Sequence, residues 1–170
     1  MSNKKIIIMC GGGGQRLWPL SNSSFPKQFL SLIDDKSLLA NTIERFDGFN
    51  EFIFLTNERY RFIIDNLIQK NQEIRNKSSI LLEPESKNTA PAICLSLFLE
   101  NNHDDVLVIS PSDHYIKETS KFNNIINNAT EIAKGTGSLV TLGIKPTKPS
   151  PQFGYIEFES ATRKNKFYNV

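Results

Sequence analysis

The sequence predicts an α/β fold built on a doubly wound, mostly parallel sheet. Short apolar runs rich in β-branched residues alternate along the chain with segments whose apolar residues recur at helical spacing. Such alternation of strand and helix is typical of parallel strands joined by right-handed crossovers. The chain has 170 residues, no internal repeat and no long linker, so we expect residues 1–170 to form one domain.

The first half of the chain carries three predicted strands and two predicted helices. Residues 6–10 form a continuous apolar run, as in strands whose two faces are both covered. Residues 38–46 have helical spacing, and residues 52–56 form a second apolar run. Residues 59–70 are expected to form a helix because their isoleucine and leucine side chains fall on one face, and residues 80–82 are expected to form a third strand.

The second half begins with a helix at the end of a short loop. Asn88 is expected to cap this helix, which runs to about Glu100, with Pro91 in its first turn, where proline loses no hydrogen bond. A strand is expected at residues 106–109 and a helix at residues 122–134. A fifth strand is expected at residues 139–142, and a terminal strand pair at residues 155–158 and 166–170.

Composition and charge exclude several classes of protein. The 20 Lys and Arg residues against 18 Asp and Glu residues give a net charge of +2, which is too small for general nucleic-acid binding. No apolar run approaches the roughly 20 residues of a membrane span, and the run after Lys5 is too short for the core of a signal peptide. The two cysteines, Cys10 and Cys94, form no disulfide framework or metal-type pair and are expected to be small buried residues. We therefore expect a cytoplasmic protein with no nucleic-acid partner and no membrane segment.

A glycine-rich segment follows the first predicted strand, at the edge where doubly wound sheets bind their ligands. Residues 11–14 are all glycine, so backbone N–H groups there can approach phosphate oxygens closely. The segment lacks the ending of a P-loop and the third glycine of a dinucleotide fingerprint, which disfavours a dinucleotide-dependent oxidoreductase. A glycine run by itself is equally compatible with a plain turn, but Arg16, with its planar donor fork, favours phosphate binding.

A second cation, Lys27, follows in the segment Pro26-Lys27-Gln28-Phe29. A single surface lysine is usually only solvated. Phe25 and Phe29 flank Lys27, however, so we expect this segment to pack against the protein.

Four motifs in the same order resemble those of the sugar-nucleotide pyrophosphorylases. Residues 11–21 followed by residues 26–29 are similar to the signature of that family, and residues 17–21 resemble its bacterial mannose-1-phosphate guanylyltransferase branch. Three further segments resemble segments of that branch. Residues 83–84 with 88–93 resemble its base-binding segment, and residues 111–114 resemble its metal-binding segment. Residues 143–147 with 153–156 resemble its sugar-side segment. Four ordered motifs across nearly the whole chain are far more specific than any one of them.

The resemblance implies a Rossmann-like nucleotide-diphospho-sugar transferase fold, with residues 1–170 as the nucleotide-binding portion of a nucleotidyltransferase domain. It implies transfer of GMP from GTP to mannose 1-phosphate, which gives GDP-mannose and pyrophosphate. The catalytic residues it implies are Arg16 and Lys27, which would neutralise the triphosphate, and Asp113, which would bind Mg²⁺. The nucleotide-binding residues it implies are Gly11, Gly12, Gly13, Gly14, Glu83 and Asn88, and the sugar-binding residue it implies is Gly154.

Several of these residues also have a simpler interpretation. Asp113 fits a turn or cap residue before the next helix. Glu83 fits a solvated side chain at a strand end, although a carboxylate there can accept hydrogen bonds from the two N–H donors of guanine. Asn88 can cap a helix and lie near a nucleotide at once. Gly154 can mark a bulge rather than a close approach of the backbone to a ligand.

Known members of this family continue beyond the sugar-side segment with a Glu-Lys-Pro motif for the sugar phosphate and, later, a second Asp for magnesium. The present sequence ends at Val170, and Lys164 and Lys166 lack the Glu and Pro neighbours of that motif. We therefore expect a sheet that is incomplete at its C-terminal end, weak nucleotide binding with little turnover, and self-association through an exposed sheet edge. Two alternatives stay open: a shortened, non-catalytic member that binds nucleotide or a partner subunit, and a pyrophosphorylase for another nucleoside triphosphate or hexose 1-phosphate.

Overall fold

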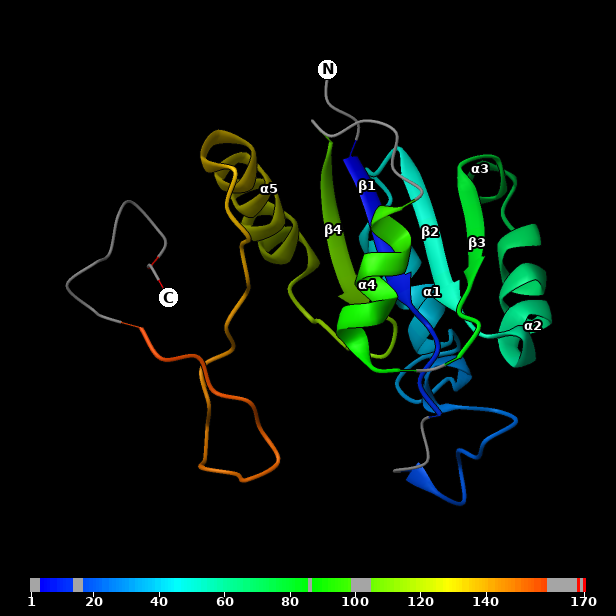
Figure 1. Cartoon of the computed structure of the whole chain (residues 1–170). Helices are drawn as coiled ribbons and strands as arrows, with labels where there is room; N and C mark the ends of the chain where they lie inside the picture. The colour runs from blue at the N-terminus through cyan, green and yellow to red at the C-terminus, as the bar shows by residue number, and fades with distance from the viewer. Residues whose placement is uncertain (1–3, 14–16, 86, 99–104, 159–167, 169) are drawn as a thin grey trace. The chain divides into compact units, whose positions relative to one another are not determined.

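The structure is a computed structural model that describes residues 4–13, 17–85, 87–98, 105–158, 168 and 170. The chain divides into two compact units, residues 1–138 and residues 139–170. The first unit is built on a four-stranded parallel sheet with the order β3-β2-β1-β4, drawn in Figure 1. The strands are β1 (Lys4–Met9), β2 (Glu51–Thr56), β3 (Ser78–Leu82) and β4 (Val106–Pro111).

Helices cover both faces of this sheet. In Figure 1, helix α4 crosses in front of the strands while α1 lies behind them. The helices are the 3₁₀ helix η2 (Lys27–Phe29) and the α-helices α1 (Leu38–Arg45), α2 (Glu58–Gln69), α3 (Gln72–Asn76), α4 (Thr89–Leu97) and α5 (Thr119–Thr136).

The central strand β1 explains why the sequence carries continuous apolar runs. Ile6 and Ile8 point into one core, which includes Ile64 of α2 and is closed by further side chains of α1 and α5. Ile7, on the opposite face, lies in a second core with Ala92 of α4. Because both faces of the strand are buried from Ile6 to Ile8, those positions are all apolar. The predicted doubly wound α/β fold is therefore confirmed.

The strand order reverses beside β1. The chain passes outward from β1 to β2 and β3, and then returns to place β4 on the other side of β1. Ile7 of β1 accordingly lies in register with Ile53 of β2 and with Ile109 of β4. Open α/β sheets bind ligands beyond the carboxyl ends of their strands at such a switch point. The segments that follow β1 and β4 are therefore the first place to look for a site.

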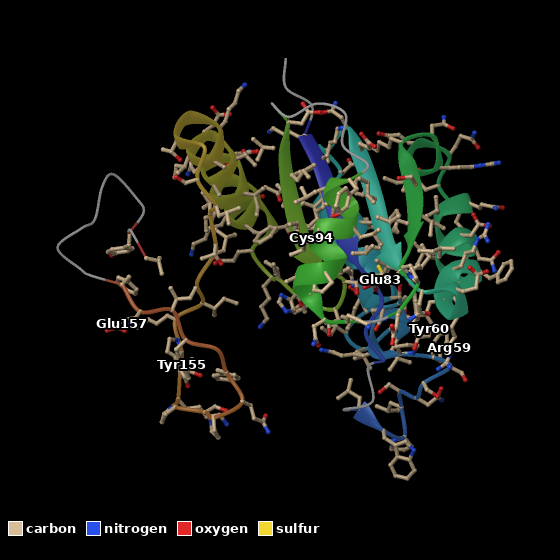
Figure 2. All side chains as sticks on the ribbon, viewed as in Figure 1. Arg59, Tyr60, Glu83, Cys94, Tyr155 and Glu157 are labelled. Carbon is tan, nitrogen blue, oxygen red and sulfur yellow. The ribbon has the colours of Figure 1, made fainter. Side chains whose placement is uncertain are left out.

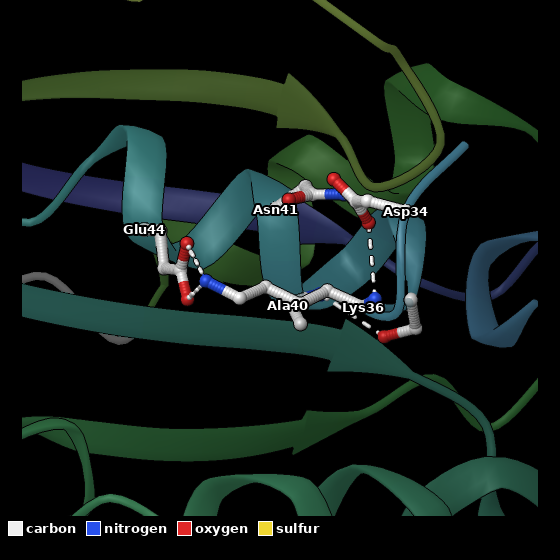
Figure 3. A network of polar contacts seen from close by, with 6 residues as sticks. Asp34, Lys36, Ala40, Asn41 and Glu44 are labelled. Atoms are coloured by element: carbon white, nitrogen blue, oxygen red, sulfur yellow. Dashed lines mark hydrogen bonds and ion pairs between the residues drawn. The ribbon is translucent and has the colours of Figure 1, made fainter. Parts of the chain in front are cut away.

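A polar network holds the beginning of α1 (Figure 3). The hydroxyl of Ser37 caps the helix by accepting a hydrogen bond from the N–H of Ala40 at 3.1 Å. The carboxylate of Asp34 accepts hydrogen bonds from the side chain of Asn41 and from the N–H of Lys36, each at 3.0 Å. These bonds lower the pKa of Asp34, the side-chain bond from Asn41 most of all. The first turn of α1 is therefore fixed to the loop before it.

Two of the C-terminal strands predicted from the sequence are wrong, and the third lies mostly outside the described residues. Residues 139–142 and 155–158 form no strand, and of residues 166–170 only Tyr168 and Val170 are described, neither of them in a strand. Leu139 is fully exposed. An apolar run becomes a strand only where a neighbouring strand takes up its hydrogen bonds, and the described part of residues 139–170 provides no such neighbour.

Three details of the first unit also differ from expectation. The helix after Asn88 ends at Leu97 rather than near Glu100, and residues 99–104 lie outside the described part. Helix α3 was not predicted, because five residues are too few to show a periodic pattern. Cys10 is buried as expected, but Cys94 is exposed on α4, where Figure 2 labels it, because no described residue covers the outer face of that helix.

The described helices were also compared with the length and apolarity of a membrane span. None of them is long and apolar enough to cross a membrane.

Candidate functional site

The glycine-rich segment and the residue after β3 meet at the carboxyl edge of the sheet. Backbone pairing continues past the strands, since the N–H of Cys10 donates to the carbonyl of Leu55 at 2.7 Å. The N–H of Glu83 likewise donates to the carbonyl of Thr56 at 2.7 Å. As a result, a methyl group on Gly11 would lie only 2.5 Å from Oε2 of Glu83. The structure thus brings these two predicted nucleotide-binding residues together, and a side chain at position 11 would displace the Glu83 carboxylate from its present place.

Glu83 also lines a cleft beside α4, and Figure 2 shows it next to the end of β3. The cleft has a volume of about 240 Å³, and its mostly apolar wall includes Pro84, Pro91, Ala92 and Leu95. Partial burial raises the pKa of the Glu83 carboxyl. An apolar wall with a carboxylate among its lining residues suits a flat ring whose edge carries N–H donors.

A larger hollow of about 430 Å³ lies against α2, α3 and β3, where Arg61, Arg75 and Ile80 contribute to its lining. None of the residues predicted as functional from the sequence belongs to it. Its lining comes mainly from the flank of the sheet, whereas open α/β sheets bind their ligands beyond the strand ends. We therefore assign the site to the carboxyl edge and not to the larger hollow.

Lys27 and Asp113 come together at the switch point between β1 and β4. The 3₁₀ helix η2 carries Lys27, and the segment after β4 carries Asp113. Lys27 Nζ lies 3.5 Å from Asp113 Oδ2, and the two side chains are 33% and 38% exposed. A pair this accessible to solvent contributes little to folding stability. Two of the three predicted catalytic residues are therefore neighbours whose charges remain accessible to a ligand.

A buried amide ties the Lys27 segment to the glycine-rich segment. Gln28 Nε2 donates to the carbonyl of Cys10 at 2.9 Å and to the carbonyl of Gly12 at 3.1 Å, and the Gln28 side chain is buried. Phe29 is also buried, with its ring edge-on to the ring of Tyr60 at 5.8 Å between centroids. The prediction that this segment packs against the protein is confirmed.

Asn88 occupies the predicted position before α4 but does not cap the helix with its side chain. Its backbone has φ 71° and ψ −174°, a region that residues other than glycine rarely occupy. The side chain makes no hydrogen bond to the first turn. The expected cap is therefore wrong in its mechanism, because a capping side chain requires an extended backbone with negative φ.

The remaining predicted residues are less informative. A methyl group on Gly12 or Gly13 would meet no atom of the described residues within 4 Å, so the packing of those residues does not require either glycine. Gly14 and Arg16 lie outside the described residues. Gly154 belongs to the second unit and is exposed. The proposed roles of these five residues stay predictions.

Asp113 is the candidate metal ligand. Searched across the described residues, the chain shows no group of three or more His, Cys, Asp or Glu side chains that could enclose a metal ion. Mg²⁺ is usually held by one or two carboxylates, with phosphate oxygens and water in its other positions. A partly exposed carboxylate beside a glycine-rich segment is compatible with that donor set, so the residues present fit Mg²⁺ bound together with a phosphorylated ligand.

Two polar residues at the end of β2 were not predicted. Asn57 Nδ2 donates to the carbonyl of Gly11 at 3.4 Å, while Asn57 Oδ1 is buried without a hydrogen-bond partner among the described residues. Within the same residues, Oγ1 of Thr56 is also buried and unpartnered. A signal for Asn57 was present, because Asn57 follows the second predicted strand as Gly11 follows the first, and parallel strands end at one edge.

Comparisons with known proteins show which family the chain belongs to. Residues 5–169 match the family described as Nucleotidyl transferase. Mannose-1-phosphate guanylyltransferase of Escherichia coli is 38% identical over 170 residues, which cover 96% of this chain and 36% of that protein. A putative mannose-1-phosphate guanylyltransferase of Vibrio cholerae is 46% identical over 156 residues, which cover 88% of this chain and 33% of that protein.

A solved structure supports the fold. The crystal structure named mannose-1-phosphate geranyltransferase, from Thermus thermophilus, has a TM-score of 0.83 and 27% identity, and the match covers 99% of this chain and 48% of that one. This chain spans about a third of the length of the curated relatives it matches. The resemblance predicted from the motifs is confirmed by these matches, and the chain belongs to the nucleotidyl transferase family.

Proposed function

We propose that this chain is the nucleotide-binding part of a mannose-1-phosphate guanylyltransferase and binds GTP with Mg²⁺ at the carboxyl edge of its sheet. The observation that carries the proposal is the meeting of Lys27 and Asp113 beside the glycine-rich segment. A cation and a carboxylate at a switch point are what a metal–triphosphate ligand needs. The names of the Escherichia coli and Vibrio cholerae relatives supply the guanylyl group and its acceptor, mannose 1-phosphate.

Glu83 is proposed to recognise the base. A carboxylate can accept hydrogen bonds from N1–H and from the exocyclic amine of guanine, whereas adenine offers no such pair of donors on that edge. The apolar wall formed by Pro84, Pro91 and Leu95 beside Glu83 suits the faces of a purine ring. Asn57 adds a buried acceptor next to Gly11 at the same edge.

Lys27 and Asp113 are proposed to handle the triphosphate. Asp113 would hold Mg²⁺, which when bound supplies positive charge to the phosphates. Once Asp113 is engaged in this way, Lys27 is released from its pair with Asp113 and can donate to phosphate oxygens. Arg16, at the end of the glycine-rich segment, is proposed to add a second cation to the triphosphate.

The reaction joins two anions, so its catalysis depends mainly on positioning and on charge neutralisation. A phosphate oxygen of mannose 1-phosphate attacks the α-phosphorus of GTP, and the bond from that phosphorus to the bridging oxygen of the β-phosphate breaks. The electron pair leaves with pyrophosphate, whose developing charge Lys27 and Arg16 would stabilise.

Both cysteines are free thiols, as suits the cytoplasmic location that we propose.

Binding measurements with GTP and ATP test the assignment of the base and the metal. We expect GTP to bind more tightly than ATP, and Mg²⁺ to strengthen GTP binding. Glu83→Gln should weaken GTP binding by about tenfold, since hydrogen bonds to a charged group contribute roughly 1.5–3 kcal/mol. Glu131→Gln, an exposed carboxylate on α5, is the matched control and should change neither affinity. An equal loss for GTP and ATP in Glu83→Gln would mean that Glu83 does not read the base.

A turnover assay tests the reaction itself. The chain is incubated with Mg²⁺, GTP and mannose 1-phosphate, and the formation of GDP-mannose and pyrophosphate is followed. GTP binding without product would favour a non-catalytic, nucleotide-binding role for this chain. Product formed only with another nucleoside triphosphate or another hexose 1-phosphate would replace the proposed substrates.

A further inference from the structure

Helix α1 reaches the segment that carries Asp113 with two buried side chains. Thr42 and Arg45 lie three residues apart and so share one face of the helix, and both are buried. The hydroxyl of Thr42 lies 3.3 Å from the carbonyl of Ser112, and Arg45 Nη2 donates to the carbonyl of His114 at 2.6 Å. Because Ser112 and His114 flank Asp113, α1 contacts the main chain on both sides of this carboxylate.

Arg45 carries a charge in a place where charge is unfavourable. The residue is 4% exposed, its guanidinium lies 5.6 Å from the centre of the Phe122 ring, and burial lowers its pKa. Among the described residues Arg45 forms no ion pair with a carboxylate, and its Nη1 is buried without a partner. A buried cation without a counter-charge destabilises a fold, whereas an apolar side chain of similar length does not. Within the described residues the guanidinium makes three contacts: the hydrogen bond to the His114 carbonyl, a longer one to the hydroxyl of Thr42 at 3.4 Å, and the Phe122 ring. Of these, the bond to the His114 carbonyl is the shortest and the one that reaches the segment around Asp113.

The segment is also tied to β1. Ser112 is buried, and the residue before it, Pro111, lies in register with Met9, which precedes Cys10. The carbonyl of Cys10 in turn accepts the bond from Gln28. The main chain around Asp113 is thus held by α1 and by the end of β1, while the Asp113 side chain itself is 38% exposed. Two elements thus support the main chain around Asp113: helix α1 and the end of β1. The start of α1 is itself held by the polar network of Figure 3.

The geometry points to Thr42 and Arg45 as positioning residues that fix the Asp113 carboxylate for binding a divalent metal ion. This inference rests on the proposed function, since it requires Asp113 to be the metal ligand. A ligand whose main chain is already held loses less conformational freedom when the metal binds. Partners of this kind, which do not touch the metal, typically change metal affinity by about 10–100-fold when they are removed.

The test uses the full chain with GTP and with Mn²⁺, a paramagnetic substitute for Mg²⁺ whose free and bound forms are distinguished by electron paramagnetic resonance. Arg45→Met keeps the apolar stem and removes every donor. We expect it to weaken Mn²⁺ binding by about 10–100-fold, with little change in metal-free GTP binding. Arg45→Lys can still donate to the His114 carbonyl and should recover part of the loss. Asp113→Asn should remove Mn²⁺ binding.

A second variant and a matched control separate positioning from general stability. Thr42→Val is isosteric and should also weaken Mn²⁺ binding. It loses the contact with Ser112, a 2.9 Å bond to the carbonyl of Leu38 and the 3.4 Å bond that the hydroxyl accepts from Arg45. Arg59→Met is the control, because Arg59 also contacts a backbone carbonyl, that of Ser23 at 3.4 Å, and should leave Mn²⁺ affinity unchanged. Each titration is made well below the thermal midpoint of its variant, where a loss of stability alone does not alter affinity.

The outcomes separate this inference from the function on which it rests. Wild-type chain that binds no Mn²⁺ in the presence of GTP would overturn the proposed function. Wild-type chain that binds Mn²⁺, with unchanged Mn²⁺ affinity in Thr42→Val and in folded Arg45→Met, would overturn only the positioning role. The positioning role would also be overturned if the variants lost metal-dependent and metal-free GTP binding equally, because an equal loss would show a general disturbance of the site. If Arg45→Met does not fold, Thr42→Val and Arg45→Lys decide.

Discussion

Among single residues, Gly11 constrains the position of Glu83, because a methyl group on Gly11 would lie 2.5 Å from Oε2 of Glu83. We expect Gly11→Ala to displace that carboxylate and to weaken GTP binding by about tenfold, the effect of losing a hydrogen bond to a charged acceptor. The thermal midpoint should change little, since the displaced atom ends a flexible side chain. Gly48→Ala, whose methyl group would meet nothing within 4 Å, is the control for both measurements. A large fall in midpoint with unchanged affinity would make Gly11 purely structural.

Glu83 also makes the site sensitive to pH. Burial raises the pKa of its carboxyl in the folded chain. At any pH between the ordinary pKa of the unfolded chain and this raised pKa, the folded state therefore holds more protons than the unfolded state. The free energy of unfolding of wild type, relative to Glu83→Gln, should therefore decrease as the pH rises through that interval. GTP affinity should increase over the same interval, because guanine requires the ionised form.

Urea unfolding and GTP titration of both proteins between about pH 4 and 7, where carboxyl groups with raised pKa titrate, check these trends. Comparison with Glu83→Gln removes the contribution of the other carboxylates. A difference between the two proteins that does not vary with pH would show that Glu83 has the same pKa in the folded and unfolded chains.

At the scale of elements, the beginning of α4 is strained where the beginning of α1 is not. Asn88 has φ 71° and makes no capping bond, whereas Ser37 caps α1 through the N–H of Ala40. We expect Asn88→Gly to raise the free energy of unfolding by about 1 kcal/mol, because glycine adopts this conformation without strain. Ser37→Ala should lower it by about 1 kcal/mol, the usual effect of losing a cap. Urea unfolding measures both. A loss of stability in Asn88→Gly would mean that the asparagine side chain makes a stabilising contact.

The edges of the sheet predict association between copies of the chain. In the described sheet β3 and β4 each have one hydrogen-bonded neighbour, so each presents an open edge. Unpaired edges favour pairing with another strand. We expect the mass measured by light scattering to increase with protein concentration. A constant monomer mass across that range would contradict this prediction.

At the scale of the whole molecule, the two compact units differ in how they resist proteolysis. Every residue from 135 to 149 is exposed, and residues 139–158 contain no helix or strand. We expect limited proteolysis to cleave within residues 139–158 and to leave a fragment of the first unit, residues 1–138. That fragment should keep the thermal midpoint and the GTP affinity of the full chain, because Lys27, Glu83 and Asp113 all belong to the first unit. Mass spectrometry of the fragments locates the cleavage, and an initial cut within β4 or α5 would contradict the prediction.

Local patterns were enough to locate much of the first unit. The apolar runs predicted all four described strands to within a few residues, because strands of a parallel sheet covered on both faces carry continuous apolar runs. Helical spacing found α1, α2 and α5 for the corresponding reason, since one buried face imposes its period on the residues. The motifs at Gly11, Lys27 and Asp113 pointed to one edge of the sheet, because parallel strands end together.

Contacts between distant segments were beyond the reach of those patterns. The run at residues 139–142 has the composition of a strand but lacks a neighbour to pair with, and no local feature reports that lack. Asn57 meets Gly11 only because β1 and β2 are adjacent, and Arg45 meets the carbonyl of His114 only because α1 packs beneath the end of β4. Such contacts depend on how the elements pack, so the residues that support Asp113 emerge only once the chain is folded.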